Sequence, residues 1–142
     1  MQSPYFDLLK NSDELQASTM ERFRELWRSY YADLQRYTAD AQVKARGLWQ
    51  SYLQELRTAG TGDDSAERVA TSQSNFQRAY AELDAHYARA CREREQKLAE
   101  ALASLNSDWC QRTLDGMIRY LEAIRSSLPK AAPEGSASST KS

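Results

Sequence analysis

The sequence is poor both in residues that interrupt helices and in residues that favour strands. Five glycines and three prolines are spread over 142 residues. The β-branched aliphatic residues amount to two valines and two isoleucines. Strands are enriched in β-branched residues, whereas the alanine, leucine, glutamate, glutamine and arginine that dominate this chain favour helices. The composition therefore argues against a sheet and predicts an all-α fold.

Neither an excess of charge nor a long apolar run is present. Nineteen basic residues face twenty acidic ones, and no basic block stands out to neutralise the phosphates of a nucleic acid. No apolar run approaches the roughly 20 residues that a membrane-spanning helix requires. The N-terminus has no positive charge before Lys10 and no apolar segment of the kind found in a signal peptide. We therefore expect a cytoplasmic protein with no nucleic-acid partner and no transmembrane segment.

Patterns that carry catalysis or hold a metal or cofactor are also missing. The sequence has no glycine-rich phosphate loop, no CxxC pair and no nucleophile elbow. His86 is the only histidine, and Cys91 follows it by five residues, on a different face of a helix. Glu82 precedes His86 by four residues, whereas di-iron bundles use a Glu-x-x-His spacing. We predict that the chain is not an enzyme and binds no cofactor or metal.

Two long amphipathic segments are what the sequence does contain. Apolar residues recur in steps of three and four over residues 13–58 and again over 66–127, which predicts two long helices within a domain at 1–128. Residues 59–65 form the loop between them, where Gly60 can end the first helix in the left-handed conformation. Such a short loop favours an antiparallel hairpin.

The two ends of the chain differ from this pattern. Pro4 is suited to a first helical position, so residues 4–10 either form a separate turn or lead straight into the first helix. Residues 129–142 are mostly small and polar and cannot bury enough surface to offset the entropy of ordering. We therefore expect a disordered tail there.

The apolar pattern repeats every eleven residues. Residues 26–34 resemble residues 48–56 at an offset of 22, which is twice eleven. Eleven residues make almost three whole helical turns, so equivalent residues return to one face, and coiled-coil-like helices of this period pack nearly straight. In the second helix the period is carried by Phe76, Tyr87, Leu98, Trp109 and Tyr120.

Two architectures remain open. At about 1.5 Å per residue the second helix is the longer by about 20 Å, so residues 112–127 should project beyond their partner unless they fold back. Asn106, Ser107 and Asp108 could cap a third helix and close a three-helix bundle. Otherwise two hairpins could associate into a four-helix bundle, which would cover the flanking residues Tyr31, Leu53, Leu114 and Ile118.

Fourteen aromatic residues are a heavy load for a helical chain. Their rings either fill the space between helices or form a surface that meets a partner. We predict an interaction surface, used for self-association or for a protein partner. Its members are Trp27, Tyr30, Trp49, Tyr52, Phe76, Tyr80, Tyr87 and Trp109.

Arg94 and the two cysteines allow alternative interpretations. Arg94 falls in the apolar stripe, where it either fixes the register of the helices or lies at the edge and reaches water. Cys91 and Cys110 are about 28 Å apart along a continuous helix, too far to pair within one chain. They are either small buried residues or sites that an antiparallel dimer brings nearer to each other.

The layout resembles that of phasins, proteins that coat polyhydroxyalkanoate granules in bacteria. The likeness covers residues 15–125 and includes a first amphipathic helix, the acidic break at Gly62-Asp63-Asp64 and the helix ERVATSQSNFQRAYAELDAHYARA. A Pro/Ala/Ser/Lys-rich tail follows, as in many members. The resemblance implies a soluble oligomer whose amphipathic face adsorbs to a hydrophobic polymer. The residues themselves favour a helical interaction or scaffold protein, and an accessory subunit of an enzyme complex is a further alternative.

Overall fold

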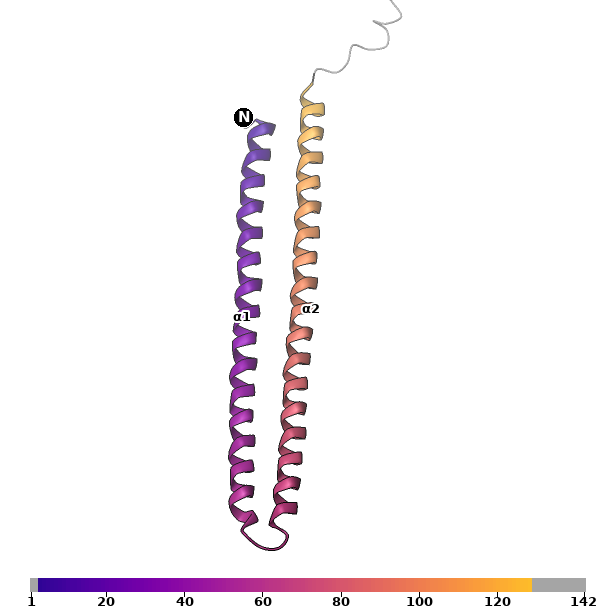
Figure 1. The fold of residues 1–142 in the computed structure, drawn as a ribbon. Coiled ribbons are helices and arrows are strands. Elements are labelled where there is room, and N and C mark those ends of the chain that lie inside the picture. Colours follow the sequence, from indigo (N-terminus) through magenta and orange to yellow (C-terminus); the bar gives the residue numbers. More distant parts are fainter. Residues whose placement is uncertain (1–2, 129–142) are drawn as a thin grey trace, which may run out of the picture. The chain divides into compact units, whose positions relative to one another are not determined.

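The computed structural model describes residues 3–128, and these form two helices with no strand among them (Figure 1). Helix α1 spans Pro4–Ala59 and helix α2 spans Ser65–Ser127. The all-α prediction is confirmed for this part of the chain. The predicted tail at 129–142 lies outside the described residues.

Helix α1 begins nine residues before the predicted start at residue 13. Pro4 has no N–H that would need a partner in the first turn, and its φ angle suits a helix. The backbone N–H of Asp7 donates to the carbonyl of Ser3 at 3.1 Å, which closes the first turn. Residues 11–13, which could have capped a new helix, are exposed and continue the same one. The N-terminal residues thus lead straight into the long helix.

The loop between the helices depends on one glycine and one aspartate. Gly60 has a φ of 67°, the left-handed conformation that ends a helix and that other residues adopt at a cost. The carbonyl of Asp64 accepts the N–H of Arg68 at 3.0 Å, so Asp64 is the residue that precedes α2. Its carboxylate lies 2.9 Å from the Arg68 guanidinium. The carboxylate therefore sits where the N-terminal end of the helix dipole favours negative charge.

Helix α2 continues without a break through Asn106, Ser107 and Asp108, so a third helix does not form. The carboxylate of Asp108 does not cap a helix. It accepts hydrogen bonds from Arg22 of α1 and from Arg112 one turn onward, both at 3.3 Å. Leu105 is buried just before this point, at 5% exposure, which keeps the helix packed where a break was possible.

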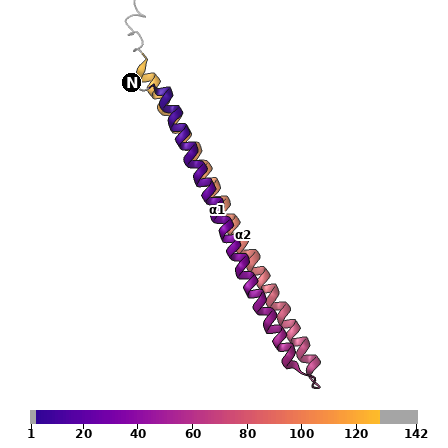
Figure 2. The same ribbon diagram turned by 90° about the vertical axis from the view of Figure 1, so that its left-hand side faces the viewer.

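The chain divides into two compact units, and both helices pass through each of them. The loop unit comprises Glu25–Ala101, and the terminal unit combines the described residues before Glu25 with those after Ala101. In the loop unit the two helices run antiparallel and side by side on either side of the loop, in both views (Figures 1 and 2). Contacts between Trp49 and Phe76 and between Thr38 and Tyr87 show the same antiparallel pairing.

The terminal unit corrects, for residues 112–120, the expectation that residues 112–127 project beyond α1. Because α1 begins at Pro4, its first turns lie beside the end of α2. The Tyr5 and Tyr120 rings are 6.3 Å apart, and one groove is lined by residues of 8–18 and of 112–119.

Candidate interaction surface

The eight aromatic residues predicted to form the interaction surface fall into two groups. Tyr30 is buried, and Trp27, Tyr52, Phe76 and Tyr87 are half-buried. Trp49, Tyr80 and Trp109 are exposed. The first group therefore serves mainly to hold the helices together, and only the second group remains open to a partner.

Aromatic contacts bind the two helices of the loop unit. The Phe76 ring of α2 lies 4.8 Å from the rings of both Trp49 and Tyr52 of α1. Tyr80 contacts Phe76 from the next turn at 5.8 Å. Offset and tilted arrangements at such distances are favourable for aromatic pairs. Trp49 and Tyr80 lie at the edge of this cluster and keep large parts of their rings in solvent.

A charged pair crosses the apolar interface of the loop unit. The Arg94 Nε donates to the Asp33 carboxylate at 2.6 Å, and its guanidinium also reaches the Ser29 hydroxyl at 3.4 Å. The Arg94 side chain is only 14% exposed and lies 5.7 Å from the centre of the Tyr30 ring. The Arg94 hydrogen bond, aided by the charge of Arg36, lowers the pKa of Asp33. Arg94 thus belongs to the helix interface, which fits a role in fixing register.

Tyr30 is part of the same polar cluster. Burial of its ring, together with the negative charge of Glu95, raises the pKa of Tyr30. One turn of α1 therefore carries both the buried Tyr30 ring and the carboxylate of the ion pair. Further along, the Tyr87 and Thr38 hydroxyls lie 2.8 Å apart and link the helices a second time.

The loop unit exposes apolar side chains on one side. Tyr31 and Leu53 are 57% and 45% exposed and lie 22 residues apart on α1, so they point the same way. Gln42, midway between them, lines a groove of about 210 Å³ together with Tyr80 and Asp84 of α2. The exposed stripe of α1 and the Tyr80 turn of α2 therefore share a side. We call this side the loop-unit face, and its apolar members are Tyr31, Trp49, Leu53 and Tyr80.

The ion pair lies on a different side of the helices from this face. Asp33 follows Tyr31 by two residues, or about 200° around the helix. The Asp40–Lys44 pair, at 3.1 Å, is likewise about 180–220° from Gln42. The Asp33–Arg94 and Asp40–Lys44 ion pairs are therefore separated from the loop-unit face.

The terminal unit repeats this arrangement. A groove of about 350 Å³ is lined by Met20 and Phe23 of α1 and by Leu102 and Trp109 of α2, among others. Arg22, two residues from Met20, points elsewhere and pairs with Asp108 at 3.3 Å. Met20 lies eleven residues before Tyr31, at the same position of the repeat.

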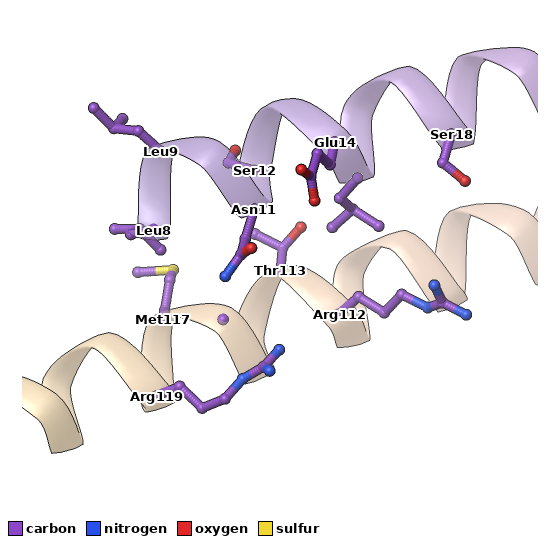
Figure 3. Close-up of a pocket in the computed structure, with 12 residues that line it drawn as sticks. Leu8, Leu9, Asn11, Ser12, Glu14, Ser18, Arg112, Thr113, Met117 and Arg119 are labelled. Carbon is purple, nitrogen blue, oxygen red and sulfur yellow. The ribbon is translucent and has the colours of Figure 1, made fainter. Parts of the chain in front are cut away.

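A second groove of about 610 Å³ separates the first turns of α1 from the end of α2 in the terminal unit (Figure 3). The side chains of Leu8 and Met117 approach each other at its apolar end. Gly116 leaves the floor open, because no atom lies within 4 Å of the place where a Cβ would be. The Arg112 guanidinium is held by Asp108 at 3.2 Å, so it is compensated within the chain.

Chemically reactive residues do not gather on these surfaces. His86 is exposed, and Cys91 and Cys110 are free thiols, half-buried and exposed respectively. Over residues 3–128 no group of three or more metal-ligating side chains comes together. Within the same range, neither helix has an apolar stretch that could cross a membrane.

Comparisons with known proteins give no family assignment. No protein-family model, no curated protein and no solved structure matches the chain. The resemblance to phasins stays a prediction. Function has to be inferred from the surface of the chain itself.

Proposed function

We propose that the chain is a non-catalytic helical interaction protein that binds through the apolar side of its helices. The observation that carries this proposal is the segregation of side chains in the loop unit. Tyr31, Trp49 and Leu53 are each between 45% and 57% exposed on one side, and the Asp33–Arg94 pair lies on another. Exposed apolar patches of this extent mark sites of interaction.

Self-association and coiled-coil-like packing belong to the same proposal. Half-buried or buried positions of α2 recur every eleven residues, at Leu83, Arg94, Leu105 and Gly116. An eleven-residue repeat suits long helices that pack nearly straight against further helices. Only four apolar residues are buried among those described, which leaves much apolar surface for additional helices to cover. These features support an oligomeric bundle.

Light scattering behind a sizing column, with and without hydrophobic polymer particles, tests the proposal. The test variant is Leu53→Glu, which places a charge on the loop-unit face. The control is Val43→Glu, because Val43 is 65% exposed and lies about 100° from the Leu53 stripe. The proposal requires that Leu53→Glu weakens association or adsorption while Val43→Glu does not. Equal behaviour of the two variants and the wild type in every condition would contradict it.

A surface-coating role of phasin type is the second candidate. The same segregation suits adsorption to a flat apolar surface, since the charged side would stay in water. Depletion of the wild-type chain onto the particles, lost in Leu53→Glu, favours this candidate. A defined oligomer that ignores the particles favours the scaffold. Co-purification with an unrelated polypeptide would instead indicate an accessory subunit of a complex.

A further inference from the structure

The loop-unit face has the size of a stable protein interface. Aromatic side chains have roughly 150–250 Å² each to bury, so the exposed parts of Tyr31, Trp49 and Tyr80, with Leu53, amount to roughly 400 Å². A standard interface buries roughly 800 Å² per partner, a little over half of it apolar, which is roughly 450 Å². The face can therefore supply the apolar part of one such interface.

The spacing on the face is that of a helix-packing surface. Tyr31, Gln42 and Leu53 follow each other at eleven residues, as do Phe76, Tyr87 and Leu98 within the helix interface. A straight stripe of this period is best matched by a helix with the same period. The chain itself provides such helices.

The two edges of the face carry opposite charge. On α1, the residues that follow the stripe by four positions are Gln35, Arg46 and Arg57. On α2, the residues that follow Tyr80 and Cys91 by four positions are Asp84 and Glu95. None of the ion pairs found among residues 3–128 involves Arg46, Arg57, Asp84 or Glu95. The face thus has one basic and one acidic edge without salt-bridge partners.

From this complementarity we infer that a second copy of the chain covers the loop-unit face, related by a twofold axis parallel to the helices. Such an axis lays α1 of each copy along α2 of the other, so basic edges meet acidic edges. A twofold axis across the helices would instead lay like edges together. Electrostatic complementarity selects between orientations in this way. The inference rests on the proposed function, because it names the partner of the same face.

The groove within one chain shows which residues of the two copies lie at the same height along the helix axes. Gln42 and Asp84 line the same groove, so they lie at one level along the helices. Arg46 is one turn from Gln42. An axis parallel to the helices keeps every residue at its own level. Arg46 of one copy therefore comes within about one turn of Asp84 of the other, within reach of a long side chain.

Sedimentation equilibrium of the full chain at low salt tests the inference with a charge reversal and its rescue. The wild type is expected to be a dimer. Arg46→Glu and Asp84→Arg, tested singly, should each weaken the dimer by about tenfold, since the twofold axis doubles every lost pair. The double variant should recover most of the affinity. Helix content by circular dichroism should be the same in all four chains, since both residues are exposed.

The outcomes separate the inference from the proposed function. Reversals that weaken the dimer without recovery in the double variant would overturn the twofold arrangement. A wild type that stays monomeric up to about 100 μM, well above the micromolar dissociation constants of typical specific pairs, would overturn the second copy as partner. In either case, adsorption to particles that is lost in Leu53→Glu and kept in Val43→Glu would leave the proposed function standing.

Discussion

Arg94 of α2 reaches across the apolar interface and donates to the carboxylate of Asp33 on α1 at 2.6 Å. The two residues are 61 positions apart in sequence, and their side chains are 14% and 24% exposed. Arg22 and Lys44 lie eleven residues before and after Asp33, at the same position of the repeat. A slip of the helices by one repeat would therefore bring Arg94 against a like charge. The pair thus favours the observed register over a slip by one eleven-residue repeat.

Removing one partner of this pair should be costly. We expect Arg94→Ala to lower the free energy of unfolding, because Asp33 would remain partly buried with less compensation. A double-mutant cycle with Asp33→Ala, measured by urea denaturation, should give a coupling energy of stabilising sign. Additive losses would mean that the two side chains do not interact in solution.

Acid should weaken the loop unit through Asp33. The Arg94 hydrogen bond lowers the pKa of Asp33 below its ordinary value of 3.8, so the folded chain keeps this carboxylate charged where the unfolded chain takes up a proton. The stabilisation is therefore present above pH 3.8 and is lost as the pH falls through the lower folded-state value. Urea denaturation between pH 7 and pH 3 should show a smaller acid-induced loss in Asp33→Asn than in the wild type. Parallel curves would contradict the assignment.

Alkaline pH should act through Tyr30 in the opposite sense. Burial and Glu95 raise the pKa of Tyr30 above the ordinary tyrosine value of 10.0. Its contribution to stability is complete below pH 10 and is lost as the pH rises through the higher folded-state value. Absorbance titration at alkaline pH should show one tyrosine that ionises late, and Tyr30→Phe should abolish that late step. A late step that persists in the variant would assign it to another residue.

The glycines should respond to alanine in opposite directions. Gly47 and Gly116 lie within helices, and a Cβ at either position would meet no atom within 4 Å. We expect each alanine variant to raise the free energy of unfolding by about 0.5–1 kcal/mol. Gly60→Ala should lower it by about 1 kcal/mol or more, because φ there is 67°. Thermal unfolding of the three variants measures the contrast.

The helices were predictable because their signals are local. The steps of three and four, the loop at 59–65 and Gly60 as the end of the first helix all follow from residues close in sequence. The start at Pro4 stayed one of two alternatives because residues 11–13 are good capping residues, and only the continuation of α1 shows that they are not used. Residues 112–120 then gain a partner that the shorter helix could not provide.

The candidate surface was harder to predict because one amphipathic stripe was expected where the chain has two. Tyr30 and Tyr31 are adjacent, yet Tyr30 is buried and Tyr31 is exposed. The predicted list followed the inner stripe and therefore included Tyr30, Tyr52 and Phe76. The outer stripe consists of Met20, Tyr31, Gln42 and Leu53 and has the same eleven-residue period. It is displaced from the inner stripe by one residue, as Tyr31 is from Tyr30. That displacement was the available signal, although the side occupied by α2 becomes evident only in the folded chain.

Fluorescence of Trp49 tests the central claim, that a partner covers the exposed apolar side, most directly. With Trp27→Phe and Trp109→Phe, Trp49 becomes the only tryptophan and reports from the loop-unit face, where it is 49% exposed. We predict that its quenching by acrylamide falls several-fold, with a blue shift of emission, as the chain is concentrated or meets hydrophobic particles. Leu53→Glu should prevent the change, and Val43→Glu should not. A Trp49 that stays equally accessible at every concentration and on every surface offered would contradict the account.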